Sequence, residues 1–217
     1  MIIAIDGPSG AGKGTVARTV ASLLGYLHID TGAMYRAVAW KTLQEHLQLD
    51  EEAGIATLAQ RAQMTLSNGV VTIDGQDVTK AIRTSEMDKA AAAVARLGKV
   101  REVLVARQRD YARAGGVVME GRDIGTVVFP NADVKIYLDA SAEERARRRA
   151  SDPAHTGGAA GQAAVAQSIQ ARDQSDTTRA VSPLTLAADA VRIDTTGMPI
   201  QAVVDRVMEL VKAKTTS

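Results

Sequence analysis

The chain has 217 residues, of which 46% are hydrophobic and 24% charged, as in an ordinary globular protein, and this length suits one compact domain with a small insertion or two. The net charge of +1 provides no general attraction for nucleic acid or for a membrane surface, and the absence of cysteine excludes disulfides, thiolate metal sites and thiol nucleophiles. The 26 basic residues comprise 18 arginines and 8 lysines, a bias that suits phosphate binding but decides nothing by itself.

The N-terminal part of the sequence alternates between strand and helix patterns. The apolar run at residues 1–5 predicts a strand, and the sequence that follows predicts a loop and then a helix that ends at Gly25. Residues 26–29 predict a second strand, and residues 31–47 predict a helix with Thr31 as its cap. This order is typical of a parallel sheet.

The period changes between residues 64 and 78, where apolar residues alternate around Asn68-Gly69 and Asp74-Gly75. Both dipeptides are strong turn signals, so we expect a small antiparallel meander here. Residues 85–96 and 99–114 then predict two helices, because their apolar residues recur at helical spacing.

Strands and helices alternate again further along the chain. Apolar runs at 117–119 and 134–139 predict buried strands, and residues 141–150 predict a helix that opens with Ser141 and Glu144 in a capping box.

The last part of the chain contains one low-complexity stretch. Residues 151–164 are rich in glycine and alanine, so we expect a mobile segment. Residues 165–180 predict a helix that ends before Pro183, residues 190–194 a last strand and residues 200–212 a last helix. The whole pattern predicts an α/β protein whose parallel sheet is covered on both faces.

The stretch GPSGAGKGT carries the clearest functional signal. Glycines at positions 7, 10 and 12 let backbone N–H groups turn toward phosphate oxygens, and the following helix presents its positive end. Lys13 adds a full charge beside the β and γ phosphates. Because a strand precedes the loop and a helix follows it, we expect a nucleotide-binding P-loop. The residues expected to bind ATP are Gly7, Pro8, Ser9, Gly10, Ala11, Gly12, Lys13, Gly14 and Thr15.

The loop departs from the general P-loop pattern at one position. The serine or threonine that normally follows the lysine and holds Mg²⁺ is replaced by Gly14, and the hydroxyl comes one residue later. Thr15 is therefore the candidate for the hydroxyl on the metal side.

An anionic phosphate acceptor requires a second cationic cluster opposite this loop. Each pair of like unit charges at ~5 Å costs about 3 kcal/mol at an effective dielectric constant near 20, whereas an ATPase that attacks with water needs only one arginine. Arg172, Asp176 and Arg179 are spaced for one helix stripe, which fits a surface salt-bridge ladder as well as a binding site. Arg36 and Arg122 fall where the crevice of a parallel sheet is expected.

Four more arginines are crowded on the helix predicted to enter the low-complexity segment. Neighbouring like charges repel one another unless an anion lies among them, so this helix can contribute to an ATP clamp. The sequence does not select among its candidates, which are Arg145, Arg147, Arg148 and Arg149.

Four motifs together resemble the bacterial cytidylate kinase family. They are IDGPSGAGKGT at 5–15, DTGAMYR at 30–36, GRDIGTVVFP at 121–130 and RDQSDTTRAVSPL at 172–184, and the resemblance spans nearly the whole chain. It implies the transfer of a phosphoryl group from ATP to CMP or dCMP with Mg²⁺. It also implies a three-layer P-loop NTPase-type fold with a five-stranded parallel sheet, a small antiparallel β insertion and a short lid.

The resemblance implies a division of the single domain and a role for each site residue. The core would be formed by about 1–30, 115–150 and 180–217, the monophosphate-binding region by about 31–114 with the meander at about 64–79, and the lid by about 151–164. Lys13, Arg122 and Arg179 would be catalytic. The CMP site would comprise Arg36 and Arg122 at the phosphate, Arg101 and Asp123 at cytosine, Arg172 and Asp176 at the ribose, Arg179 between the two phosphates, and Asp30, Thr31 and Tyr35 beside the monophosphate.

The chemistry of the base agrees with this implied site. Cytosine offers an N4 amino donor beside acceptors, which complement a carboxylate and a guanidinium, whereas uracil would leave the carboxylate facing an oxygen. Ala92 stands where the family often has a serine that contacts the base.

Two alternatives remain open at this stage. The chain could be a P-loop kinase for another small acceptor, such as UMP or shikimate, or a nucleotide sensor without transfer activity, although the guanine-reading pattern Asn-Lys-x-Asp is absent from the sequence. We expect a cytoplasmic monomer without nucleic-acid or membrane partners.

Overall fold

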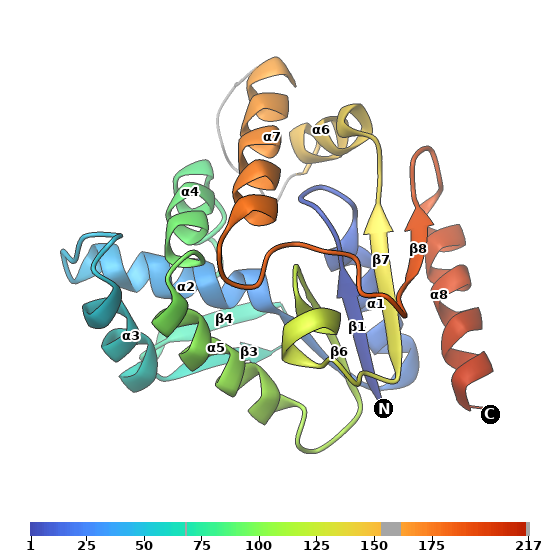
Figure 1. Ribbon diagram of the computed structural model, residues 1–217, viewed down its shortest axis with the longest axis horizontal. Coiled ribbons are helices and arrows are strands. Elements are labelled where there is room, and N and C mark those ends of the chain that lie inside the picture. The colour runs from blue at the N-terminus through green and yellow to red at the C-terminus, as the bar shows by residue number, and fades with distance from the viewer. Residues whose placement is uncertain (68, 153–161, 216–217) are drawn as a thin grey trace.

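A five-stranded parallel sheet with the order β2-β6-β1-β7-β8 forms the centre of the molecule (Figure 1). The computed structural model describes residues 1–67, 69–152 and 162–215. The strands are β1 (Ile2–Asp6), β2 (Leu27–Asp30), β6 (Val117–Gly121), β7 (Val134–Asp139) and β8 (Val191–Asp194). The predicted parallel sheet is confirmed.

Alternate side chains of the strands point into two apolar layers, one on each face of the sheet. Ile3 packs with helices α1 (Lys13–Leu24) and α8 (Ile200–Thr215), whereas Ala4 points to the opposite face and packs with α2 (Thr31–Gln44). Strands buried on both faces carry continuous apolar runs, which is why β1 and β6 are apolar over most of their length. The result is the three-layer arrangement expected from the sequence.

The small antiparallel sheet lies outside the central one. It contains β3 (Met64–Ser67), β4 (Val70–Ile73) and β5 (Gln76–Asp77) in sequential order. This sheet confirms the predicted meander, and Gly75 takes the positive φ of 79° that a tight turn requires. The turn residue Asn68 lies outside the described residues.

Three helices accompany the small sheet. Helices α4 (Ser85–Val94) and α5 (Gly98–Tyr111) confirm the two predicted there, while α3 (Glu52–Arg61) was not anticipated. Ile55 and Leu58 bury the inner face of α3, but Glu51 at its N-cap makes no side-chain capping bond. Helix α3 therefore has apolar residues at helical spacing but lacks the N-cap residue that usually marks the start of a helix.

Two helices flank the segment expected to form a lid. Helix α6 (Ala142–Ala150) follows β7, and α7 (Gln162–Thr178) packs beside α6 above the carboxyl ends of β1 and β7 (Figure 1). Residues 153–161, most of the predicted lid, lie outside the described residues.

The N-terminus of α2 differs from the prediction. Asp30, not Thr31, is the cap, because its Oδ1 accepts a hydrogen bond from the backbone N–H of Ala33 at 2.9 Å. Thr31 is the first helical residue, and its hydroxyl donates to the carbonyl of Glu120 at 2.7 Å. This bond ties α2 to β6 across the crevice.

The predicted capping box on α6 forms only in part. Ser141 Oγ accepts from the N–H of Glu144 at 3.2 Å, as expected. The Glu144 carboxylate, however, binds Arg147 and Arg148, and the N–H of Ser141 donates to the hydroxyl of Thr196 at 2.9 Å. Two guanidinium partners outweigh one backbone amide.

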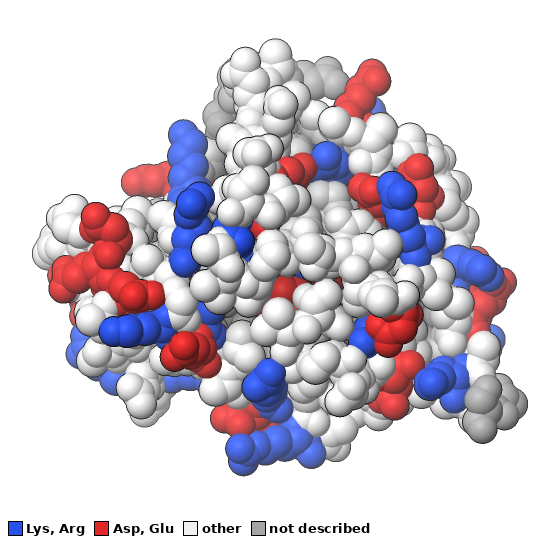
Figure 2. All heavy atoms as spheres, viewed as in Figure 1, with Lys and Arg blue, Asp and Glu red and all other residues white. Residues whose placement is uncertain are grey.

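Acidic and basic side chains are interspersed over the face shown in Figure 2. Within the described residues, no helix has both the length and the apolar composition that a membrane span requires. The interspersed charges agree with the small net charge of +1.

Candidate active site

The phosphate loop joins β1 to α1 in a conformation that requires glycine. Gly7 has φ 144°, and a Cβ at this position would lie 2.0 Å from the carbonyl oxygen of Leu138 on β7. Gly10 and Gly12 also have positive φ values of 79° and 91°. The loop thus passes directly against the neighbouring strand before it enters α1.

Lys13, at the start of α1, is buried inside this loop. Its Nζ donates to the carbonyl of Pro8 at 2.7 Å. Burial, and next the nearby Arg122 guanidinium, lower the pKa of Lys13 from 10.5 to about 7. A phosphate anion in the pocket would favour the charged form of this ammonium group.

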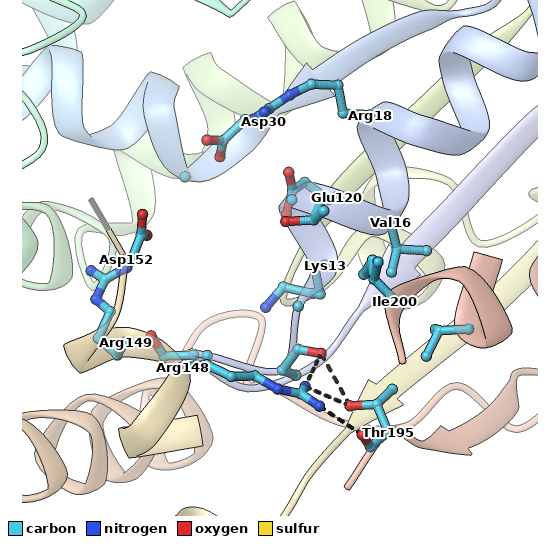
Figure 3. Close-up of a pocket in the computed structure, with 18 of the residues that line it drawn as sticks. Lys13, Val16, Arg18, Asp30, Glu120, Arg148, Arg149, Asp152, Thr195 and Ile200 are labelled. Carbon is cyan, nitrogen blue, oxygen red and sulfur yellow. Dashed lines mark hydrogen bonds between the residues drawn. The ribbon is translucent and has the colours of Figure 1, made fainter. Parts of the chain in front are cut away.

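A pocket of about 580 Å³ opens beside the loop. Figure 3 shows Lys13 reaching into it with Glu120 nearby, Asp30 on one side, and Arg148 and Arg149 on another. The residues proposed from the sequence that line this pocket are Ser9, Gly10, Ala11, Gly12, Lys13, Gly14, Thr15, Asp30, Arg36, Arg122 and Arg172, together with three of the four candidates on α6, Arg147, Arg148 and Arg149.

Guanidinium groups from α2, from the end of β6 and from α7 meet in this pocket. Arg36 Nη2 binds Asp30 at 2.9 Å, and burial, followed by repulsion from Arg122, lowers the pKa of Arg172. The Nε atoms of Arg36 and Arg172 are buried and have no hydrogen-bond partner among the described residues. Buried donors of this kind call for an acceptor, and phosphate oxygens supply one.

A second set of predicted residues lies behind the pocket wall in one ion-pair network. Arg122 Nε binds Asp176 at 2.7 Å, and Arg179 lies 3.9 Å from the other Asp176 oxygen. Arg179 also contacts Asp123 at 3.4 Å, and Asp123 forms a buried ion pair with Arg101. The network therefore begins at Arg122 in the pocket and ends at the proposed base-reading pair.

Tyr35 closes this network on the α2 side. The Arg101 guanidinium lies over its ring, 5.4 Å from the centroid, and burial raises the pKa of the Tyr35 hydroxyl to about 12. The hydroxyl is buried without a hydrogen-bond partner among the described residues. Gly7, Pro8, Thr31, Tyr35, Arg101, Asp123, Asp176 and Arg179 are not among the described residues that line the pocket.

The predicted helix stripe on α7 is corrected by these contacts. The helix ends at Thr178, so Arg179 lies outside it, where the chain turns back and the N–H of Leu184 donates to the Asp176 carbonyl at 2.8 Å. Arg172 pairs with Asp88 on α4 at 2.8 Å, while Asp176 pairs with Arg122. The carboxylate and the two arginines reach other elements and do not form a surface ladder along one helix.

Two arginines of α6 bind carbonyl groups of the phosphate loop. Arg145 donates to the carbonyl of Ser9 at 3.1 Å and pairs with Asp173. Arg148 binds Thr195, with 2.7 Å to its carbonyl, and approaches the carbonyl of Ala11 at 3.5 Å (Figure 3). These arginine donors bind carbonyl oxygens of the loop, and Asp173 also accepts from the N–H of Ser9 at 3.2 Å.

Sequence reasoning missed two acidic residues that line or support the site. Glu120, the residue before the GRDIG motif, lines the pocket and accepts from His28 at 3.1 Å. The sequence could have indicated Glu120, because it lies at the carboxyl end of a strand, where ligands bind in parallel sheets. Asp88 binds both Arg149 and Arg172, and its place in the first turn of α4 gave no such signal.

Asp6, at the end of β1, holds the GRDIG segment in place. Its two oxygens accept from the backbone N–H groups of Ile124 and Gly125 at 2.9 and 2.7 Å. Burial outweighs these bonds and raises the pKa of Asp6 from 3.8 to about 6. The two amides open η1 (Ile124–Val128), a turn of π-helix that directly follows Arg122 and Asp123.

Three features define a P-loop kinase. They are the parallel sheet, the lysine of the glycine-rich loop that follows β1, and the arginines that share the pocket with this lysine. Solved structures support the fold. A gluconokinase from Sinorhizobium meliloti superposes with a TM-score of 0.52 at 15% identity, covering 99% of this chain and 93% of the other. A shikimate kinase from Bacteroides thetaiotaomicron gives a TM-score of 0.50 at 11% identity, with 98% of both chains covered.

Sequence comparisons identify the family within this class. The family model described as cytidylate kinase matches residues 3–213. A cytidylate kinase of Desulforamulus reducens is 51% identical over 97% of this chain and 96% of its own. The Bacillus subtilis cytidylate kinase is 47% identical over 98% and 96%. The chain belongs to the cytidylate kinase family and is a nucleoside monophosphate kinase, as the sequence motifs predicted.

Proposed function

We propose that the pocket seats ATP and CMP end to end and that its arginines neutralise the phosphates between them. The activity is the transfer of the γ-phosphoryl group of ATP to CMP or dCMP, and the observation that carries the site assignment is the convergence of Lys13, Arg36, Arg122 and Arg172 on one cavity. The family membership disfavours shikimate or a purely sensory role. The phosphate loop at 7–15 holds the donor.

The acceptor phosphate binds at Arg36 and Arg122 in this proposal. Both line the pocket, and the buried Nε of Arg36 lacks a partner among the described residues. We assign Arg172 and Asp176 to the ribose and Arg179 to the phosphates between donor and acceptor, although Asp176 and Arg179 lie behind the residues that line the pocket. We assign residues 31–114 to the region that binds the monophosphate. Thr31 and Tyr35 belong to this region and lie beside the monophosphate in our proposal.

Asp123 and Arg101 read the cytosine. They are buried and paired with each other, so the base must replace part of this pairing when it binds. A carboxylate and a guanidinium complement the amino group and the acceptors of cytosine, and an unpaired carboxylate facing uracil is costly.

The residues around the loop fit Mg²⁺ carried in with the nucleotide. Mg²⁺ prefers oxygen ligands and takes most of them from phosphates and water, so one or two protein oxygens suffice. Thr15 and the Glu120 carboxylate line the pocket and would hold it. When bound, the ion supplies positive charge beside the phosphates.

The chain itself supplies alignment and charge, with no general base. The CMP phosphate is already a nucleophile, so the protein must hold two polyanions in line and offset the charge that spreads during transfer. We assign this task to Lys13 and Arg122, which line the pocket, and to Arg179, which is connected to Arg122 through Asp176.

The direct test is coupled measurement of ADP release with CMP, dCMP, UMP, AMP and shikimate offered separately. We expect CMP and dCMP to drive release, and ADP release that is independent of CMP would overturn the proposal. Lys13→Ala should abolish transfer and leave CMP binding nearly intact. Lys80→Ala, which removes an exposed lysine, is the matched control and should retain full activity.

A further inference from the structure

Asp88 lies between two arginines that come from the neighbouring helices α6 and α7. It belongs to the first turn of α4, within the region proposed for the monophosphate. Its Oδ1 accepts from Arg172 Nη1 at 2.8 Å, and its Oδ2 accepts from Arg149 Nη2. One carboxylate therefore binds α6 and α7, the two helices that flank residues 153–161, to the acceptor side of the fold.

Both partners of Asp88 also belong to the pocket. Arg149 and Arg172 line the cavity that contains Lys13. Arg172 remains 17% exposed and keeps its buried Nε without a partner among the described residues, so it can still donate to a ligand while Asp88 holds its other end. The carboxylate thus fixes each guanidinium without replacing the ligand.

The charges around Arg172 explain why such an anchor is needed. Burial and the positive charges of Arg122 and Arg36 all work against the charged form of Arg172. Asp88 and Asp176 are the carboxylates that offset them, and Asp176 is already bound to Arg122 at 2.7 Å. Without Asp88, repulsion would drive the Arg172 side chain away from the other arginines.

We propose that Asp88 is a positioning residue that holds Arg172 toward the CMP ribose and Arg149 toward the transfer pocket. It acts through the two arginines and does not touch substrate. The proposal rests on the proposed function, because it assigns Arg172 to the acceptor. It adds a residue that ties acceptor binding to the helices of the donor side.

The test is a double-mutant cycle on CMP affinity, measured by calorimetry with Asp88→Asn, Arg172→Gln and the double variant. Loss of one charge-assisted contact typically changes an equilibrium about tenfold, so we expect Asp88→Asn to weaken CMP binding about tenfold. The double variant should bind CMP no more weakly than Arg172→Gln alone, because Asp88 acts through Arg172. A purely structural role would instead give independent, multiplicative losses.

Glu86→Gln is the matched control. Glu86 is also acidic and in the first turn of α4, but it is exposed, so this variant changes the same charge on the same helix end without altering the pocket. It should bind CMP as the parent protein does. If Asp88→Asn does not fold, Asp88→Glu keeps the carboxylate and should stay within about threefold of the parent, since the charge-assisted bonds are retained.

The outcomes separate this inference from the function on which it rests. A parent protein that neither binds nor phosphorylates CMP would refute the proposed function itself. A parent protein that binds CMP while Asp88→Asn binds it equally well or more tightly would overturn only the role of Asp88.

Discussion

The lowered pKa of Lys13 predicts that ATP binding takes up a proton. The pKa of Lys13 is lowered to about 7 because the side chain is buried beside Arg122. Phosphate oxygens next to Nζ favour the charged form, so the bound protein should keep Lys13 protonated through neutral pH. Uptake should then be about 0.1 proton at pH 6, about 0.5 at pH 7 and about 0.9 at pH 8.

Titration calorimetry in two buffers with different ionisation enthalpies measures this uptake directly. Measurements at pH 8 avoid the ionisation of the terminal phosphate itself, whose second pKa lies near 6. By linkage, the dissociation constant for ATP should also rise nearly tenfold between pH 8 and pH 9.

Lys13→Arg is the control, because guanidinium stays protonated at every pH used. Any uptake that remains in this variant belongs to the nucleotide or to other groups. Equal uptake in the parent and in Lys13→Arg, or an ATP affinity that does not change between pH 8 and pH 9, would refute the reasoning.

Three further predictions follow from single residues. Gly7→Ala places a Cβ 2.0 Å from a backbone oxygen and should cost at least about 2 kcal/mol in urea unfolding. Gly25→Ala, with φ 66° and nothing within 4 Å, should cost only about 1 kcal/mol; equal losses would contradict the steric argument. Asp6 has a folded-state pKa raised to about 6, so its contribution to stability is lost as pH rises through that value. Relative to Asp6→Asn, the parent should therefore lose about 2 kcal/mol between pH 4.5 and pH 7, and a constant difference would exclude the raised pKa. Asp123→Ala should lower the kcat/KM ratio of CMP over UMP about tenfold, more than it lowers turnover on UMP. An unchanged ratio would remove Asp123 from base recognition.

The parts of the fold predicted from sequence are those set by local patterns. The phosphate loop was predictable because a strand, three glycines, a lysine and a helix are consecutive in the chain. The meander at 64–78 was predictable because its turns carry Asp-Gly and Asn-Gly. Helix α3 was missed because it lacks a side-chain cap.

The pairing of charged residues could not be predicted, because it depends on contacts between distant segments. Arg122 and Asp176 are 54 residues apart, and Arg172 and Asp88 are 84 apart. Helical spacing suggested a partner for Arg172 four residues along its own helix, but the tertiary contact was preferred. The sequence also could not decide whether Asp30 or Thr31 caps α2, since both residue types cap helices well.

The buried pairing of Asp123 with Arg101 and Arg179 has a consequence for how tightly a base can be held. These charges already satisfy one another within the protein, so a nucleotide gains only the difference between the free energy of its own contacts and that of the contacts it displaces. Such an exchange favours selectivity among bases over tight nucleotide binding. A poorly matched base breaks the existing ion pairs and makes weaker contacts than those it displaces. Modest affinity then becomes compatible with rapid product release.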